Sequence, residues 1–284
     1  MNTDEIKKLL KDQEIWPKKG LGQNFLVHKD LLQEITGAAS LKKKDVVLEI
    51  GPGLGILTKA LAKKAKRVVA VEKDPRMVDI LLRTVAKEHP NVEIIEGDVL
   101  DLVKGSSLTR SRIGFGRIKE YKVVANLPYY ITSPVIRMFL EAKVQPKVMV
   151  LMVQKEVAQR ICAKPPEMSL LAVSVQAYAK PEIISLVSKN AFWPQPKVDS
   201  AILRITPLMN ADKKLINADT FFRVVKAGFK HPRKQLASNL SKGLGLPKEE
   251  ISQLLSQNGV EPTARAETLS VEKWLGLAKS IGNK

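Results

Sequence analysis

The sequence predicts an α/β protein whose mostly parallel sheet is followed by a small, all-helical C-terminal domain. From Asp45 to about Pro207, short apolar runs alternate with longer amphipathic ones, a pattern typical of strands alternating with helices. After Pro207 the pattern becomes helical throughout and is broken only by glycine and proline. We therefore expect two domains, at residues 1–207 and 208–284.

The expected strands are short runs rich in valine and isoleucine: 46–50, 68–72, 92–95, 123–125 and 147–153, with a final pair at 183–187 and 198–205 that can be antiparallel. Periodicity alone leaves a core helix open for the run at 147–153. Helices are expected at 57–66 and 75–87, and Pro75 suits a first helical turn. The expected helices of the C-terminal domain are 218–229, 233–240, 248–257 and 271–281.

Basic residues dominate the charge of the chain. Its 284 residues include 47 Lys and Arg against 29 Asp and Glu, a formal net charge of +18. This excess favours a polyanionic partner such as nucleic acid, and the alternative is a basic surface with no dedicated partner. The irregular stretch 104–122 and the segment 213–234 hold thirteen of the basic residues and two acids. We expect both to contact the phosphates of a structured RNA.

Several classes of protein are disfavoured. Cys162 is the only cysteine, so an intramolecular disulfide cannot form, and the three histidines are too scattered for a metal site. No metal is therefore expected. No apolar run approaches the roughly 20 residues of a membrane span, and the first residues lack an apolar signal core. We expect a cytoplasmic protein that does not bind membranes.

Three glycines, Gly51, Gly53 and Gly55, lie directly after an expected strand and before an expected helix. Glycines there let the backbone pass close to a ligand and present N–H groups at a helix start. A dinucleotide fingerprint would also need a glycine at position 56, which is Ile56, and this weakens an oxidoreductase interpretation. The tighter spacing fits the Rossmann-like sheet of class I methyltransferases. A structural turn without a ligand is the alternative.

Two acids follow the next strands. Glu72 ends the second strand, where a carboxylate can accept hydrogen bonds from the ribose hydroxyls of an adenosine moiety. Asp98 follows the third strand, where it can accept one from an adenine amine. Each acid alone could be a solvated strand end. Because the ends of parallel strands share one edge of a sheet, the acids and the glycine turn together predict a nucleoside site. The Gly-Lys-Ser/Thr phosphate loop of many ATPases is absent from the sequence.

The tetrapeptide 126–129 follows the fourth strand and indicates the chemistry. Adenine's exocyclic amine is a poor nucleophile, because its lone pair is delocalised into the ring. The Asn126 side-chain oxygen and the Leu127 carbonyl could accept its hydrogens, with Pro128 stiffening the turn. Tyr129 could stack on the base, which is worth about 1–3 kcal/mol. Catalysis would come from positioning and would need no metal. A strand-ending turn with a core tyrosine is the alternative.

Four motifs occur in order along the chain: GLGQNFL at 20–26, EIGPGLG at 49–55, NLPY at 126–129 and NAFWPQPKVDS at 190–200. Together they resemble the motifs of the rRNA adenine dimethyltransferases, and the match extends from about residue 18 to the C-terminal helices. The resemblance is closest to the bacterial small-subunit branch. It implies S-adenosylmethionine as the methyl donor and 16S rRNA, in the small subunit or its precursor, as the partner. Two adjacent adenines near the 3′ end would each be dimethylated. We expect a monomer.

The resemblance also implies roles for individual residues. The donor-binding positions would be Asn24, Leu26, Gly51, Gly53, Glu72, Asp98 and Asn126. Asn24 and Leu26 would cover the methionine end of the donor, and Asn126 would also face the target amine. Tyr129 and Phe192 would sandwich a flipped adenine. The catalytic set is therefore Asn126, Leu127, Pro128, Tyr129 and Phe192.

Two departures from the family pattern concern RNA contacts. The stretch 104–122 is longer than usual, and the sequence FKHPRK at 229–234 replaces a tighter Arg-Arg-Lys cluster. Two other functions stay open: a 23S rRNA adenine dimethyltransferase of the antibiotic-resistance type, and a non-catalytic rRNA-binding assembly factor. The motif at 190–200 favours the small-subunit enzyme, and a pure binder would need neither Glu72, Asp98 nor the tetrapeptide.

Overall fold

The computed structural model describes residues 3–104, 120–208 and 218–282, and it divides into two compact units. Unit 1 comprises Met1–Ala158 and Glu182–Pro207, and unit 2 comprises Gln159–Pro181 and Leu208–Lys284. The segment 159–181, expected in the first domain, groups with the helical unit because Met168, Ala172 and Val173 belong to that unit's core. Most of the expected basic loop at 104–122 and the residues 213–217 lie outside the described residues.

A seven-stranded sheet forms the centre of unit 1, in the order β4-β3-β2-β5-β6-β9-β7. Its strands are β2 (Val46–Ile50), β3 (Arg67–Glu72), β4 (Val92–Glu96), β5 (Lys122–Asn126), β6 (Met149–Gln154), β7 (Ala179–Val187) and β9 (Ser200–Pro207). The pairs joining β4, β3, β2, β5 and β6 are parallel, whereas β9 runs antiparallel to β6. The α/β prediction is confirmed, and the ambiguous run at 147–153 is a strand.

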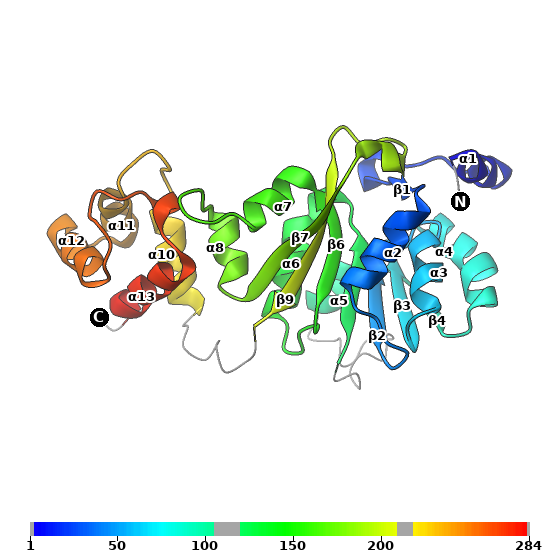
Figure 1. The fold of residues 1–284 in the computed structure, drawn as a ribbon, viewed down its shortest axis with the longest axis horizontal. Helices are drawn as coiled ribbons and strands as arrows, with labels where there is room; N and C mark the ends of the chain where they lie inside the picture. Colours follow the sequence, from blue (N-terminus) through cyan, green and yellow to red (C-terminus); the bar gives the residue numbers. More distant parts are fainter. Residues whose placement is uncertain (1–2, 105–119, 209–217, 283–284) are drawn as a thin grey trace. The chain divides into compact units, whose positions relative to one another are not determined.

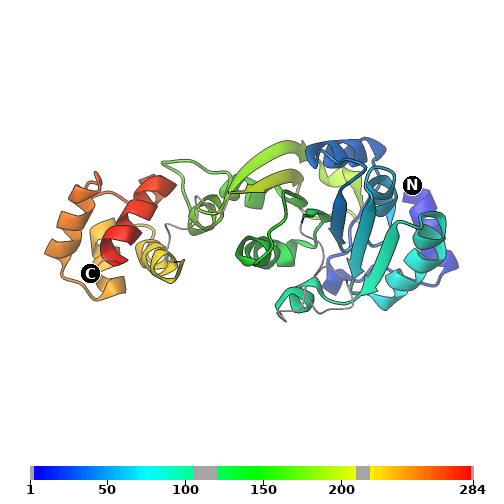
Figure 2. The same cartoon turned by 90° about the horizontal axis from the view of Figure 1, so that it is seen from below.

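Helices cover both faces of this sheet (Figures 1 and 2). They are α2 (Lys29–Ala38), α3 (Ile56–Ala62), α4 (Pro75–Leu81), α5 (Val99–Lys104), α6 (Thr132–Glu141) and α7 (Lys155–Ile161). The first three supply Ile35, Leu61 and Leu81 to a core that includes Val68 and Val124 of the sheet. The helix expected at 75–87 is α4 followed by a π-helical turn over Leu82–Ala86.

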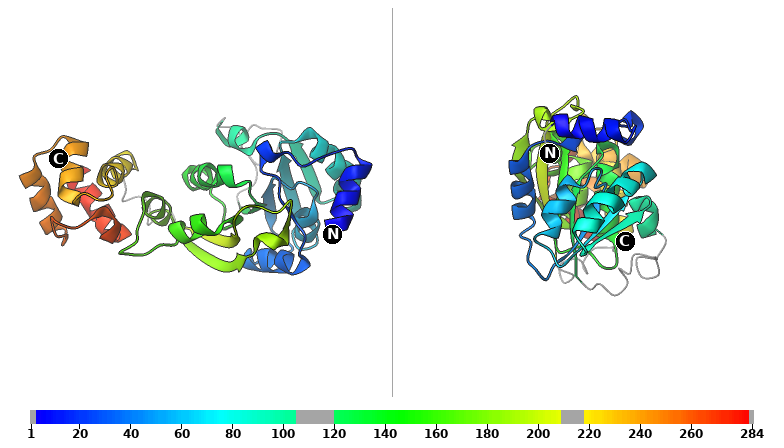
Figure 3. Two further views of the ribbon diagram at one scale, coloured as in Figure 1. Left: turned by 90° about the horizontal axis from the view of Figure 1, so that it is seen from above. Right: turned by 90° about the vertical axis from the view of Figure 1, so that its right-hand side faces the viewer.

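The N-terminal segment lies against the glycine turn. Helix α1 (Thr3–Asp12) buries Ile6 and Leu10 in a cluster with Phe25, Leu54 and Met77 (dark blue in Figure 3). Strand β1 (Phe25–Leu26) pairs antiparallel with β8 (Phe192–Trp193), so residues far apart in the sequence form one small sheet.

Unit 2 is helical, as the sequence pattern after Pro207 predicts, and its helices pack around one hydrophobic core. Its helices are α8 (Leu170–Gln176), α10 (Ala218–Gly228), α11 (Leu236–Leu244), α12 (Lys248–Gln257) and α13 (Val271–Gly282). Phe221 and Trp274 are fully buried at its centre. The buried Asn239 amide donates hydrogen bonds to the carbonyls of Gly228 and His231, at 2.8 and 2.9 Å, which fixes the turn after α10. None of the helices in the described parts of the chain is long and apolar enough to cross a membrane.

Candidate active site

A pocket opens in unit 1 at the carboxyl ends of β2, β3 and β5, where parallel α/β sheets bind ligands. Its lining comes from five stretches of chain: 21–26, 49–57 except 55, 71–73, 97–99 and 126–131. The pocket therefore contains the glycine turn, both acids, the tetrapeptide and the N-terminal motif. Of the residues to which the resemblance gave a role, Phe192 alone does not line it, and Gly55 of the glycine turn lies outside the lining as well.

The glycine turn adopts a backbone that other residues rarely tolerate. Gly51, Gly53 and Gly55 have φ values of +64°, +57° and +76°. A Cβ on Gly53 would lie 3.0 Å from the Phe25 ring, and one on Gly55 would lie 2.4 Å from Val85. The turn therefore needs glycine both for its conformation and for close packing against β1 and the π-helical turn.

The Glu72 carboxylate is buried and bound by backbone N–H groups. Its Oε2 accepts a hydrogen bond from Gly53 at 3.0 Å, and its Oε1 accepts bonds from Lys73 and Asp74 at 2.8 and 2.9 Å. A carboxylate offers about four acceptor positions, so Oε2 has room for a further donor such as a hydroxyl. Burial raises the pKa of Glu72, while the three backbone hydrogen bonds oppose that rise.

Asp98 lies two residues beyond the end of β4, at the rim of the pocket. Its Oδ1 accepts a hydrogen bond from Leu100 N–H at 2.9 Å, and its Oδ2 forms an ion pair with Lys73 Nζ at 2.8 Å. The two side chains are 25% and 57% exposed, respectively, so this ion pair is partly open to solvent. Lys73 was not singled out in the sequence, because a lysine beside an acid is ordinary on a surface.

Asn126 ends β5, and its amide group has a fixed orientation. The Nδ2 group donates a hydrogen bond of 2.9 Å to the backbone carbonyl of Asn24. Since the amide group is planar, this bond turns Oδ1 away from the N-terminal segment. Leu127 continues along the sheet, with its N–H donating to Met152 at 3.3 Å. Pro128 follows with φ −56° and ψ 127° and precedes a 3-10 turn over Tyr129–Ile131.

Two tyrosines follow in the pocket lining. The Tyr129 hydroxyl lies 2.7 Å from the Oγ of Ser200, the first residue of β9, so the ring is held by a strand that is separated from β5 by β6 alone. Burial raises the pKa of Tyr129, and the hydrogen bond with Ser200 opposes that rise. Tyr130, by contrast, is 59% exposed, and a Cβ on Gly22 would lie 3.8 Å from its ring.

Phe192 is not brought to the pocket. Its side chain is 4% exposed and packs in a core cluster with Leu26, Ile35 and Met152. The cause is the pairing of β1 with β8, which places Phe192 opposite Leu26. Leu26 itself is buried but still contributes to the pocket wall. The stacking role implied for Phe192 by the sequence stays a prediction.

Glu49, within the EIGPGLG motif, is a pocket residue for which the sequence indicated no role. It is 1% exposed, and its Oε2 has no hydrogen-bond partner. Desolvation by burial raises the pKa of Glu49 to about 8, and the nearby Glu72 charge adds to the rise. At neutral pH the carboxyl is therefore mostly protonated.

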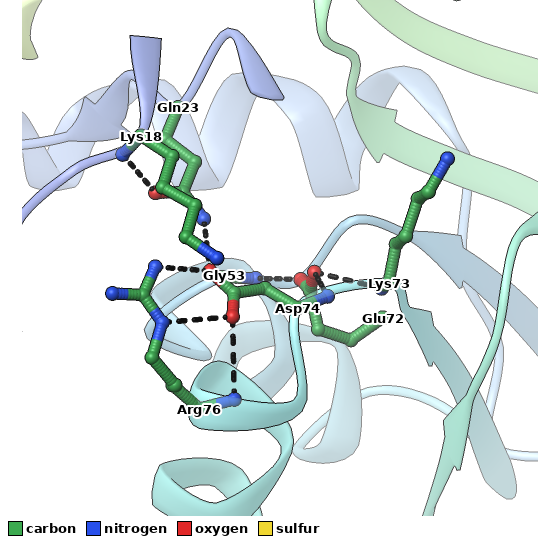
Figure 4. Close-up of polar contacts among 7 residues, drawn as sticks. All are labelled: Lys18, Gln23, Gly53, Glu72, Lys73, Asp74 and Arg76. Carbon is green, nitrogen blue, oxygen red and sulfur yellow. Dashed lines mark hydrogen bonds and ion pairs between the residues drawn. The ribbon is translucent and has the colours of Figure 1, made fainter. Parts of the chain in front are cut away.

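A network of polar side chains connects the N-terminal motif to Glu72 (Figure 4). Gln23 donates a hydrogen bond of 3.1 Å to Asp74, whose carboxylate also binds the backbone N–H and guanidinium of Arg76. The Arg76 hydrogen bonds lower the pKa of Asp74, and Gln23 contributes to the same effect. An acid before Pro75 is recognisable in the sequence as a helix cap, but its bond to Gln23 spans 51 residues and leaves no local pattern.

Two solved structures with the same architecture are methyltransferases. The chain is similar to a dimethyladenosine transferase from Plasmodium falciparum, with a TM-score of 0.75 and 26% identity over 91% of this chain and 98% of that one. It is also similar to the 23S rRNA methyltransferase ErmE, with a TM-score of 0.69 and 27% identity over 91% and 100% of the two chains. Fold and pocket together define a class I methyltransferase.

Sequence comparison identifies the family. The family model described as ribosomal RNA adenine dimethylase matches residues 17–283. A ribosomal RNA small subunit methyltransferase A from Dehalococcoides mccartyi is 44% identical over 95% of this chain and 90% of its own length. A protein with the same name from Alkaliphilus oremlandii is 38% identical over 99% of this chain and 97% of its own length. The chain belongs to the ribosomal RNA adenine dimethylase family.

Proposed function

We propose that this protein transfers methyl groups from S-adenosylmethionine to the N6 amines of two adjacent adenines near the 3′ end of 16S rRNA, in the small ribosomal subunit or its precursor. The small-subunit names of relatives that are 38–44% identical over nearly the whole chain support this substrate. The single observation that carries the chemistry is the fixed amide of Asn126, whose Nδ2 is bound to the Asn24 carbonyl.

The pocket residues fit an adenosine-bearing methyl donor. The glycine turn lines the pocket at the end of β2, and Glu72 Oε2 retains capacity to accept a hydrogen bond from a ribose hydroxyl. Asp98 lies at the rim, where its carboxylate can accept a hydrogen bond from an adenine amine. Asn24 and Leu26 contribute to the wall formed by the N-terminal motif, and we assign them to the methionine end of the donor.

The tetrapeptide then activates the target amine. In the first transfer, Asn126 Oδ1 and the Leu127 carbonyl would each accept one amine hydrogen, which would favour a pyramidal nitrogen whose lone pair points at the methyl carbon. In the second transfer, one of the two acceptors would hold the single remaining hydrogen. The sulfonium donor supplies an electrophilic methyl group, whose carbon–sulfur bond breaks as the nitrogen–carbon bond forms. The amine proton passes to water. Tyr129 holds the base by stacking, with its ring anchored to Ser200. Catalysis is positioning, which can supply much of the rate enhancement.

The RNA partner is supported by charge. The chain carries a formal net charge of +18, and the described part of the segment 213–234 includes Arg223, Lys226, Lys230, Arg233 and Lys234 in unit 2. We assign donor binding and catalysis to residues 1–207 and RNA positioning to residues 208–284, and we place the protein in the cytoplasm as a monomer. Phosphate contacts of this kind make binding strongly dependent on salt.

Methylation of defined ribosomal particles tests the proposal. Small subunits that lack the modification and, in a separate reaction, 23S rRNA are incubated with labelled S-adenosylmethionine, and the product is mapped to the base. We expect two neighbouring dimethyladenines in 16S rRNA and no label in 23S rRNA. Label in 23S rRNA instead would favour the resistance-type activity. Binding to immature subunits without any transfer would favour an assembly factor.

A further inference from the structure

Gln23 and Asn24 are consecutive residues, yet each is bonded to the end of a different strand. Gln23 is bonded to Asp74, just beyond β3, and Asn24 to Asn126 at the end of β5. In the sheet β2 lies between these two strands, and its glycine turn contributes to the same pocket. The dipeptide thus spans the pocket from the proposed ribose side to the proposed target-amine side.

On the ribose side, the connection runs through buried groups. Gln23 Oε1 accepts a hydrogen bond from Lys18 N–H at 2.8 Å, which leaves Nε2 directed at Asp74 Oδ2 at 3.1 Å. The Asp74 side chain is fully buried, and its backbone N–H donates to Glu72 Oε1 at 2.9 Å (Figure 4). Gln23 is therefore separated from the Glu72 carboxylate by one residue, Asp74, which is held rigidly by Arg76.

On the amine side, the connection is shorter. The Asn24 carbonyl accepts the hydrogen bond from Asn126 Nδ2, and the Asn24 side chain donates to the Gly22 carbonyl at 3.1 Å. Gly22 has a φ of +61°, and a Cβ there would lie 3.4 Å from Pro128. The local turn is therefore fixed on both sides of Gln23. A shift of Gln23 must move the Asn24 carbonyl, and with it the amide of Asn126.

We propose that Gln23 and Asp74 are positioning residues. Their hydrogen bond fixes the N-terminal segment, and this keeps the Glu72 carboxylate and the Asn126 amide at the relative positions that methyl transfer requires. This inference rests on the proposed function and adds two residues to it. Neither residue touches the reacting atoms. Misplacement by about 1 Å can cost two orders of magnitude in rate, so a remote hydrogen bond of this kind can control both donor binding and turnover.

Two substitutions that exchange the donor and the acceptor of the Gln23–Asp74 hydrogen bond test that bond directly. In Gln23→Glu, Oε1 can still accept from Lys18, but a carboxylate oxygen replaces the donor that faces Asp74. In Asp74→Asn, the amide can place its NH2 group toward residue 23, but it then loses the hydrogen bond that Oδ2 accepts from the Arg76 guanidinium, and the single variant measures that loss. The double variant Gln23→Glu/Asp74→Asn restores a donor–acceptor pair with its direction reversed. Gln33→Glu, at an exposed glutamine of α2 outside the pocket lining, is the matched control.

Donor affinity is measured by calorimetry without RNA, and kcat and KM are measured on unmodified small subunits. We expect Gln23→Glu to lower kcat/KM by about tenfold or more, with weaker donor binding, and the double variant to be several times more active than Gln23→Glu. Gln33→Glu should match the wild type. Losses that multiply in the double variant, with no recovery, would overturn the inference.

Two further measurements separate this inference from the proposed function. Thermal unfolding shows whether each variant is folded, and amide hydrogen exchange of residues 18–24 reports the segment without any methyl transfer. We expect faster exchange there in Gln23→Glu and recovery in the double variant. A wild-type protein that binds the donor but never methylates RNA contradicts the proposed function alone. An active wild type with unchanged exchange in Gln23→Glu contradicts the positioning role alone.

Discussion

Asn126 and Asn24, 102 residues apart in the sequence, are joined by a hydrogen bond of 2.9 Å from a side-chain amide to a backbone carbonyl. The bond connects the end of β5 to the N-terminal motif, two regions that local sequence cannot relate. It also determines which atom of the Asn126 amide is left to accept a hydrogen bond. The proposed chemistry depends on this orientation, because only Oδ1 can accept a hydrogen from the target amine.

Asn126→Asp should therefore abolish most activity while leaving the fold. The aspartate would place an oxygen where Nδ2 now donates, so it would repel the Asn24 carbonyl and rotate away. We expect the rate of methyl transfer to fall on the order of 100-fold or more, the size of effect seen when an enzyme loses one hydrogen-bonding group that is oriented toward the reacting atoms. A labelled-donor assay on unmodified small subunits measures the rate. Asn91→Asp is the control, because Asn91 donates to Ala62 and Ala65 outside the pocket. It should lower the Tm without a comparable loss of rate, and an Asn126→Asp protein with full activity would refute the assigned role.

Glu72→Gln should weaken donor binding. Three backbone N–H groups now point at the carboxylate, and a glutamine NH2 group would have to face at least one of them. We expect the donor Kd to rise by about tenfold or more, corresponding to the loss of a hydrogen bond to a charged acceptor. Calorimetric titration measures it, with Glu93→Gln as a control at a strand acid that pairs with Arg67. Equal affinities in the two variants would exclude Glu72 from the donor site.

Gly55→Ala should destabilise unit 1 through sterics alone. The backbone at Gly55 has a φ of +76°, and a Cβ would approach Val85 to 2.4 Å and Leu81 to 2.8 Å. Strained backbone and overpacking together should cost about 1–3 kcal/mol of the free energy of unfolding. Gly37→Ala, in α2 with no atom within 4 Å of the new Cβ, should instead leave stability unchanged or raise it. Denaturant unfolding of both variants gives the comparison, and similar midpoints would contradict it.

The sequence predicted the parts of this molecule that are encoded locally. Valine-rich runs gave the strands of the sheet, and Pro75 marked the start of α4 because proline suits a first turn. The glycine turn and the tetrapeptide 126–129 were recognisable because each is a short contiguous segment of the sequence.

Contacts between distant residues could not be predicted. The pairing of β1 with β8 involves two residues from each strand, too few to show a period. This pairing buries Phe192, whereas the family resemblance implied a ring that stacks on a flipped adenine. The Gln23–Asp74 bond and the grouping of 159–181 with unit 2 are likewise set by packing.

Glu49 should make stability depend on pH. Its pKa rises from an ordinary value of 4.5 to about 8 in the folded protein. Below the lower value the carboxyl is neutral in both states. Between the two values the folded state keeps a proton that the unfolded state has released, so the free energy of unfolding falls as pH rises. The free energy of unfolding falls by about 1.4 kcal/mol for each unit by which the folded pKa exceeds the unfolded one. The fall ends once the pH is above about 8.

Glu49→Gln removes this titration and keeps the size of the side chain. Denaturant unfolding of both proteins between pH 5 and 9 measures the difference, without donor present. The wild type should lose stability relative to Glu49→Gln as pH rises through this range. Glu72, whose pKa is also raised, titrates in both proteins and so largely cancels. Parallel profiles would show that the Glu49 carboxyl is already ionised in the folded state.

Leucine substitutions at Tyr129 and Phe192 distinguish a stacking ring from a core ring. Leucine fills much of the space of either ring but offers no aromatic face. Tyr129 contributes to the pocket, so Tyr129→Leu should lower kcat/KM for RNA by about 5- to 150-fold, the equivalent of 1–3 kcal/mol of stacking. Phe192 is 4% exposed in a packed core, so Phe192→Leu should reduce the free energy of unfolding modestly. If the ring stays in that core when RNA binds, RNA kinetics should be nearly intact, whereas the stacking role requires a loss of kcat/KM.

The comparison also tests the sandwich that the family resemblance implies. If Phe192→Leu lost as much kcat/KM as Tyr129→Leu while keeping its Tm, the Phe192 ring would have to leave its core cluster when RNA binds. That movement would separate Phe192 from Leu26, its partner in the β1–β8 pairing, and would therefore disturb the N-terminal segment that holds Asn126. The change in donor Kd that RNA causes would then differ between the wild type and Phe192→Leu. Identical RNA kinetics in Phe192→Leu and wild type would leave Tyr129 as the stacking residue of the pair.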